Sequence, residues 1–396
     1  MKLHRMPYVV QNMIIAELDL DERMLLSFTS KRTCRLLGMS KLYTNPYLSI
    51  KVRSDGVEVR IDNEDKWTFS IPYDKSALEN VVYWKIDGSD VRVSHEVKEV
   101  GTEIKKHTVS IVEGADFKRT RISLDPLGKL LRHLSSFLNY DILHCICHTL
   151  PNGFISQLDC SLNYAKVWIR HEHVTIREFG RFYGRFRTRE FKEDRAAVVT
   201  PKELEVLFSK IKIRELKLHV KFASAVYKYR KHPEPIGGPL IQKLILENHT
   251  WVDFSQLPTA RIISFSRQVQ SHEINTMFKS WVAGKNREIE IMYFEIGNKV
   301  TDRTRNFLFT GIAQHETQLT KAEIDSFLCY WFETNAWRPY QQRLRNIISL
   351  DIIREGDGLR ATVIVATAGS LPDPEQKVFV MVWSEENLRT IGRAID

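Results

Sequence analysis

The sequence predicts an α+β protein in which three short N-terminal helices precede a β-rich region and then an α/β array with leucine-rich-repeat-like spacing. Three observations predict this class. In the first forty residues, apolar side chains recur at the three- to four-residue period of a helix face. The following region alternates apolar and polar residues, as half-buried strands do. From Pro201 onward, strand-like runs alternate with helical or irregular connections at a spacing typical of repeat proteins.

The three N-terminal helices each have a start signal. Pro7 suits the first turn of a helix, where its missing N–H would be unpaired anyway. Asp19 and Glu22 have the spacing of a capping box for the second helix, and Ser30 can cap a third helix that ends near Gly38. The apolar residues expected on the faces of the first two helices are Val10, Met13, Ile14, Leu18, Leu25, Leu26 and Phe28.

A helical unit of this size rarely folds without a metal, disulfides or a partner. Cys34 is the single cysteine in it, so neither a disulfide nor a zinc site can form within the unit. We therefore expect one face to dock on the rest of the chain and the other on a second protein.

The residues at these positions resemble an F-box. The resemblance rests on the run Met6-Pro7-Tyr8-Val9-Val10, where Met6 takes the usual leucine place, and on Ile14-Ile15, Leu18, Leu25-Leu26 and Ser30-Lys31-Arg32. It implies binding to the Skp adaptor and, through it, to the cullin of an SCF-type ubiquitin ligase. The residues expected to bind the adaptor are Met6, Pro7, Val10, Ile14, Leu18, Leu25, Leu26, Lys31 and Arg32. The alternative is that these helices only cap the following domain.

The β-rich region spans residues 46–124. Its alternating pattern predicts an antiparallel meander with one solvated face. Its expected strands are 47–53, 57–61, 67–71, 81–86, 90–93 and 107–112. A helix should follow from Asp125, because Leu127, Leu130, Leu131, Leu134 and Leu138 have helical spacing. Two short strands are then expected at 154–162 and 166–169.

The remaining chain predicts short helices and strands in alternation. The expected strands are 211–218, 241–246, 260–265, 288–291, 351–354, 359–366 and 378–383, with a hairpin turn at 355–358. Short helices are expected near Leu204 and at 272–282, where Ile274, Met277, Phe278 and Trp281 share a face.

Several of these C-terminal segments resemble the F-box-associated type 2 domain, a family expanded in nematodes. The matching residues are 272–275, 279–284, 352–354, 357–358, 361–364 and 380–383. The resemblance implies that this domain holds the ligase target. The expected domains are thus 1–45, 46–124 and 125–396, and target-binding positions on the strands are Arg214, Lys217, Lys243 and Glu290.

Composition indicates the cellular compartment and the charge of the partners. Five cysteines scattered over 396 residues indicate reduced thiols in the cytoplasm or nucleus, and no run of eighteen apolar residues predicts a membrane span. The N-terminus has too short an apolar segment for a signal peptide. The net charge of +9 favours acidic partners in general.

Two clusters could carry chemistry. Residues 144–148 (HCICH) hold metal-ligand types, but Cys-x-Cys lacks the spacing and second pair of a zinc site, so we expect buried thiols, no metal and no cofactor. The tract 177–192 interleaves arginines with aromatic residues. It can be a solvated element, a patch for an acidic protein, or a single-stranded RNA site.

The sequence lacks a nucleophile elbow, a phosphate loop and a dinucleotide fingerprint. The resulting hypothesis is a non-enzymatic ligase adaptor that binds the Skp adaptor and an unknown target protein, with no membrane partner. The alternative hypothesis is an RNA-binding repeat protein that uses the tract 177–192.

Overall fold

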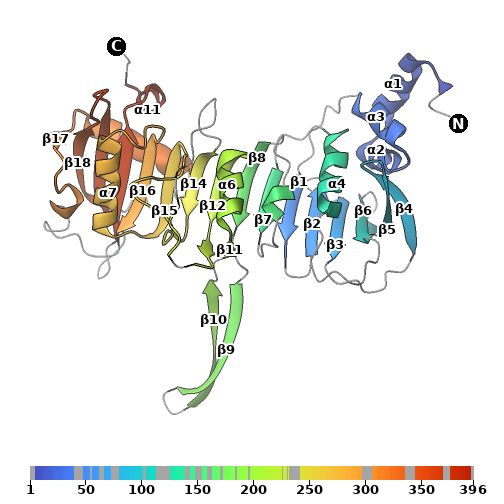
Figure 1. Cartoon of the computed structure of the whole chain (residues 1–396), viewed down its shortest axis with the longest axis horizontal. Helices are drawn as coiled ribbons and strands as arrows, with labels where there is room; N and C mark the ends of the chain where they lie inside the picture. The colour runs from blue at the N-terminus through green and yellow to red at the C-terminus, as the bar shows by residue number, and fades with distance from the viewer. Residues whose placement is uncertain are drawn as a thin grey trace. The chain divides into compact units, whose positions relative to one another are not determined.

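The computed structural model divides the chain into two compact units, Met1–Ala197 and Val198–Asp396, each described here by itself. Figure 1 shows their elements. The structure describes residues 5–39, 48–53, 56–61, 67–72, 80–100, 104–112, 125–138, 143–147, 154–157, 163–169, 173–182, 185–194, 197–224, 226–229, 231, 241–296, 306–334, 344–368 and 375–393.

The three N-terminal helices form as their start signals predict. They are α1 (Tyr8–Glu17), α2 (Leu20–Ser27) and α3 (Lys31–Gly38). Asp19 accepts a hydrogen bond from the Glu22 amide at 2.8 Å, and the Glu22 carboxylate accepts one from the Asp19 amide at 3.1 Å. Ser30 caps α3 by accepting from the amide of Thr33 at 3.0 Å. These two caps confirm where α2 and α3 begin.

The first unit is built on a mixed sheet with the order β8-β7-β1-β2-β3-β6-β5-β4. Its strands are β1 (Leu48–Val52), β2 (Gly56–Ile61), β3 (Trp67–Pro72), β4 (Val81–Ile86), β5 (Ser89–Val100), β6 (Ile104–Val112), β7 (Leu143–Cys147) and β8 (Asn163–Ile169). The predicted simple meander is wrong, because β3 pairs in parallel with β6 and β1 pairs in parallel with β7. Strand pairing is non-local, so alternation alone could not reveal it.

Alternation did locate the strands and their buried side. Along β1, β2 and β3 every second residue is buried, as a sheet with one packed face requires. The predicted leucine helix is α4 (Asp125–Ser135), and all five of its predicted leucines, including Leu138 just beyond its end, are buried. The strand predicted at 154–162 is wrong: residues 154–157 form α5 (Phe154–Gln157), and 158–162 lie outside the described residues. A run this short gives no reliable period.

A separate two-stranded antiparallel ribbon contains the basic tract. It consists of β9 (His173–Phe182) and β10 (Arg185–Asp194), with Phe182 paired to Arg185 and His173 to Asp194. Neither strand pairs with any other strand in the part of the chain that the structure describes. The short strand β11 (Ala197–Val199) follows it.

The second unit contains a sheet with the order β17-β18-β19-β20-β16-β15-β14-β12. The strands of this sheet are β12 (Lys212–Leu218), β14 (Ile241–Leu246), β15 (Ile262–Gln268), β16 (Ile291–Ile296), β17 (His315–Glu316), β18 (Arg345–Ile353), β19 (Arg360–Ala368) and β20 (Glu375–Val382). The short strand β13 (Val220–Phe222) pairs instead with β11. Strands β12, β14, β15 and β16 run parallel, while β16, β20, β19 and β18 alternate in direction. A parallel run is compatible with a repeat-like array, and the leucine-rich-repeat likeness stays a prediction.

Four helices of this unit are α6 (Pro201–Ser209), α7 (Ser271–Val282), α9 (Lys321–Thr334) and α11 (Glu385–Thr390). The predicted apolar face of α7 is fully buried. The strand predicted at 288–291 starts only at Ile291. The backbone before it turns at Gly284, which has a φ of 75°, and again where the Ile289 amide donates to the Asn286 carbonyl at 3.4 Å. Helix α9 was not predicted, although its buried residues Ile324, Phe327, Leu328 and Trp331 have the helical period.

The predicted hairpin turn between β18 and β19 is attached to α7. The Arg354 guanidinium donates to both Asp357 carboxylate oxygens and lies 5.3 Å from the centre of the Trp281 ring. The Glu355 amide donates to the carbonyl of Val282 at 2.7 Å. Gly356 and Gly358 have φ values of 92° and 70°, which favour glycine at both turn positions.

Candidate functional site

The N-terminal helices carry large apolar side chains that are exposed and that none of the described residues covers. Val9 is 68% exposed and Met13 64% exposed, and as an i,i+4 pair they neighbour each other on α1. The complete set, called here the free apolar residues, is Tyr8, Val9, Val10, Met13, Leu25 and Met39. Such a concentration of exposed apolar side chains on three short helices indicates a protein-binding surface.

The other side of the helices is packed onto the first unit's sheet. Figure 1 shows α1–α3 at the end of the sheet that holds β4, β5 and β6. Phe28, at the end of α2, stacks on Trp84 of β4 with ring centres 4.5 Å apart, and on His133 of α4 at 4.8 Å. The carbonyl of Phe28 also accepts the Lys85 amide of β4 at 2.9 Å. The helices therefore share a core with the domain that follows them.

A buried histidine joins three elements at this junction. His133 Nδ1 accepts the Asp87 amide at 3.2 Å, so Nε2 carries the proton and donates to Ser27 Oγ at 3.1 Å. Ser27 in turn donates to the Met24 carbonyl at 2.7 Å. Burial lowers the pKa of His133 to about 4, against a smaller opposing effect of the Asp87 carboxylate. The histidine is thus neutral near pH 7 and links α2, α4 and the β4–β5 turn.

A second polar contact fixes the start of α2 on the sheet. Asp21 Oδ1 accepts a hydrogen bond from the indole of Trp67 at 2.7 Å, and its Oδ2 lies 3.9 Å from His107 Nε2. The rings of Trp67 and His107 stack with centres 4.1 Å apart, and His107 hydrogen-bonds His95 at 3.0 Å. Burial lowers the pKa of both histidines. Helix α2 is therefore fixed to the sheet at both of its ends.

Helix α3 approaches α4 so closely that only glycine fits at its end. A Cβ on Gly38 would lie 2.3 Å from the carbonyl oxygen of Ser136. Next to this contact, the Cys34 thiol and the Ser136 hydroxyl lie 3.0 Å apart. Burial raises the pKa of Cys34, so the thiol stays protonated.

The predicted adaptor-binding residues fall into two groups. Pro7, Val10, Leu25, Lys31 and Arg32 are exposed, whereas Met6, Ile14, Leu18 and Leu26 are half-buried. The residue of α1 that is fully buried is Ile15. Tyr8, Val9, Met13 and Met39 were not among the expected contacts, although the apolar run at 8–10 could have pointed to the first two.

The four predicted target-binding residues of the second unit have different environments. Arg214 is exposed. The other three are engaged in ion pairs: Lys217 with Glu247 at 2.6 Å, Lys243 with Glu215 at 3.2 Å, and Glu290 with Arg261 at 2.7 Å. A target that used these three would compete with partners within the chain.

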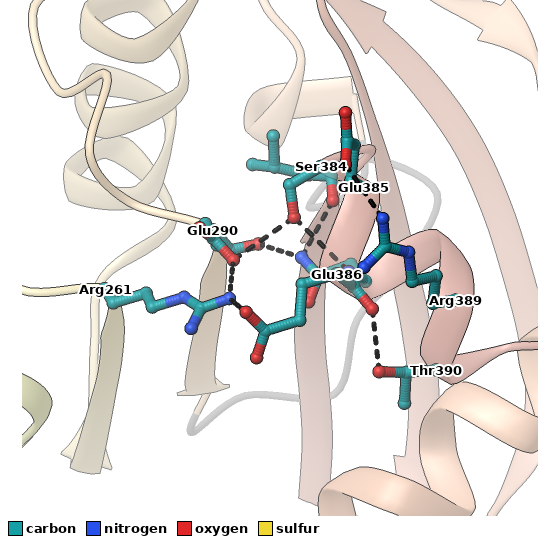
Figure 2. Close-up of polar contacts among 9 residues, drawn as sticks. Arg261, Glu290, Ser384, Glu385, Glu386, Arg389 and Thr390 are labelled. Atoms are coloured by element: carbon teal, nitrogen blue, oxygen red, sulfur yellow. Dashed lines mark hydrogen bonds and ion pairs between the residues drawn. The ribbon is translucent and has the colours of Figure 1, made fainter. Parts of the chain in front are cut away.

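Glu290 belongs to a polar cluster that fastens α11 to the sheet. Figure 2 shows Arg261 between the carboxylates of Glu290 and Glu386, which bind it and raise its pKa. Ser384, the cap of α11, donates to Glu290 at 3.1 Å. Every member of this cluster has a structural partner, so we assign it a stabilising role.

The remaining sequence candidates give no further site among the described residues. Cys145 and Cys147 are buried on β7 with their sulfur atoms 3.7 Å apart, and His148 lies outside the described residues. The described part of the chain contains no group of three metal-ligand side chains. None of its helices is both long enough and apolar enough to span a bilayer. The ribbon β9–β10 is described by its backbone pairing only.

Comparison with known families identifies the N-terminal part. Residues 3–45 match the F-box domain. The chain therefore carries an F-box at the three helices whose free and docked sides were described above. No curated protein and no solved structure matches the chain.

This assignment defines the class of the protein at a coarse level. F-box domains bind the Skp adaptor within SCF complexes, and their presence suggests a substrate-adaptor role. The F-box resemblance seen in the sequence is thereby confirmed.

Proposed function

We propose that this protein is a substrate-recognition subunit of an SCF-type ubiquitin ligase. It would bind the Skp adaptor, and through it the cullin, with the free apolar residues of the F-box. The observation that carries the proposal is the two-sided F-box: one side shares a buried core with the β4–β6 sheet, and the other exposes Val9, Met13 and Leu25. Exposed Lys31 and Arg32 add rim charge, which guides association more than it sets affinity.

The proposed mechanism requires no bond-making by this chain. A receptor that holds a target beside the ubiquitin-transfer machinery raises the effective concentration of the two reactants. The attachment of α2 at both ends limits how far the F-box can swing relative to its sheet. That rigidity reduces the entropy lost when target and transfer machinery are brought together.

The target would bind through the C-terminal part of the chain. Support comes from the resemblance of several C-terminal segments to an F-box-associated type 2 domain. Two of these segments are in contact, because Arg354 of the turn binds Asp357 and lies over the Trp281 ring of α7. Among the expected target residues, exposed Arg214 is the one best placed to contact a partner. The free thiols of Cys34, Cys145 and Cys147 support a reducing compartment, the cytoplasm or nucleus.

RNA binding is the second candidate function. The basic aromatic tract 177–192 belongs to the segment of the two-stranded ribbon β9–β10, and it combines arginines, which can pair with phosphates, with aromatic residues, which can stack on unpaired bases. This candidate predicts binding to single-stranded RNA that weakens steeply with salt.

The deciding experiment measures binding of the purified full chain to the Skp adaptor. Pro7→Asp combined with Leu25→Asp, and Met13→Asp alone, place charge on exposed F-box positions and should abolish capture while the chain stays folded. Val226→Asp is the matched control, because Val226 is 87% exposed in the second unit. Absence of binding by folded wild type would refute the proposal, and the RNA titration would then decide the second candidate.

A further inference from the structure

The β4–β5 hairpin presents part of the sheet face on which α2 lies. Alternate strand residues share a face, and the register pairs Trp84 with Val91 and Val82 with Val93. Trp84 stacks on Phe28 and meets His95 at 5.0 Å, so this face is the one that packs against α2. Val82 and Val97 occupy positions of the same face by their even spacing from Trp84 and His95.

These two valines differ from their neighbours because no part of the chain that the structure describes covers them. Val82 is 46% exposed and Val97 48% exposed, whereas Val93, which pairs with Val82, is buried. Val97 pairs with His107, which lies beside Asp21 at the start of α2. Val82 lies two residues from Trp84, which stacks on Phe28 at the end of α2. Helix α2 is therefore flanked by apolar sheet surface, and it exposes Leu25 itself.

Charged side chains surround this surface. Lys31, Arg32 and Arg35 are exposed on α3, and on the hairpin face the residue two positions from Val97 is the exposed Glu99, which pairs with Lys105 of β6. The Lys31 side chain lies across the β4–β5 turn, where a Cβ on Gly88 would be 3.3 Å from Lys31 Cδ. A partner that covers α2 and the hairpin together would thus present apolar side chains to the valines and acidic side chains towards α3.

We propose that Val82 and Val97 extend the adaptor-binding surface from the F-box onto the β4–β5 hairpin. The inference rests on the proposed function, and its occupant is the Skp adaptor already assigned to the F-box. The adaptor is the chosen partner because α2 and the hairpin are continuous with each other. The Phe28 carbonyl accepts a hydrogen bond from the Lys85 amide of β4, and the Phe28 ring stacks on Trp84. A stable complex needs about 800 Å² from each partner, and the hairpin enlarges what three short helices offer.

The test is calorimetric titration of the Skp adaptor into the full chain. The double variant Val82→Asp, Val97→Asp should weaken binding by roughly tenfold or more, because hydrated carboxylates would have to be buried. Val82→Thr with Val97→Thr keeps the β-branched shape suited to strands and should weaken binding by a smaller factor. Tyr83→Asp is the matched control, since Tyr83 is 69% exposed on the same strand but faces the opposite side of the sheet.

The outcomes separate this inference from the proposal beneath it. Weaker binding by both valine variants, with normal binding by the Tyr83 variant and normal unfolding curves, supports the extended surface. Unchanged affinity of the folded valine variants overturns it while leaving the ligase role intact, provided that Met13→Asp still abolishes binding. If folded wild type does not bind, both the ligase role and the extended surface are refuted.

Discussion

Acid should loosen the attachment of the F-box to its sheet through His133. The neutral ring accepts from Asp87 and donates to Ser27, so protonation would place an N–H on Nδ1 against the Asp87 N–H. The charged ring would also be buried beside Phe28 and Cys34. The one nearby carboxylate that favours protonation, Asp87, is itself bound to Arg132 at 2.9 Å.

The size of the effect follows from the shift in pKa. The folded value is about 4 and the ordinary value is 6.5. Because the folded pKa is the lower one, the stabilisation is complete above pH 6.5 and is lost as the pH falls towards 4. At about 1.4 kcal/mol per pH unit, the full loss is about 3 kcal/mol, of which about 2 kcal/mol has gone by about pH 5.

The assay compares urea unfolding of wild type and His133→Asn between about pH 7 and about pH 4.5. Asparagine has no titratable proton, and its amide oxygen can still accept from Asp87. The variant should be less stable near pH 7 because ring stacking on Phe28 is lost, but its stability should fall less steeply with acid. His95 and His107 titrate in both proteins and cancel in the difference. Parallel curves for the two proteins would refute the reasoning.

Three further predictions concern the docking of the F-box and the C-terminal turn. Gly38→Ala should destabilise the first unit by about 1 kcal/mol in urea unfolding, because relief of the 2.3 Å contact with Ser136 outweighs the gain in helix propensity; a more stable variant would show that α3 and α4 are not in contact. Asp21→Ala should cost about 1–3 kcal/mol by leaving the buried Trp67 N–H unpaired, whereas Asp21→Asn should retain most of the stability; equal losses would contradict this hydrogen bond. Arg354→Ala should return the pKa of Asp357 from about 2 towards 3.8, measured by carboxyl NMR titration, and an unchanged pKa would rule out the Arg354 contact as its main cause.

Local signals carried the sequence predictions furthest. The Asp19–Glu22 box and Ser30 defined two helix starts because a cap is a contact between residues three apart. Helix α7 and strand β4 were located from period alone, and β4 ends at the predicted residues. Both signals depend on neighbouring residues, so no tertiary information was needed.

The buried side of α1 could not be predicted in the same way. This helix has apolar residues around most of its circumference, so the period did not distinguish the docked side from the free side. Val10 and Met13 were placed with Ile14 on one face, yet they are exposed and Ile15 is buried. The side that is buried depends on what packs against the helix, which is a property of distant residues.

The F-box, the strand alternation and the absence of a local catalytic signature were determined by the sequence by itself. Each of them depends only on residues that are close together in the chain. Tertiary structure alone decided that β3 pairs with β6, that His133 links α2 to α4, and that Val82 and Val97 remain uncovered beside α2. These contacts join residues about forty to over a hundred positions apart. Their formation depends on the entropy lost when a long loop is closed and on competition among many apolar surfaces. Neither can be predicted from a local sequence pattern.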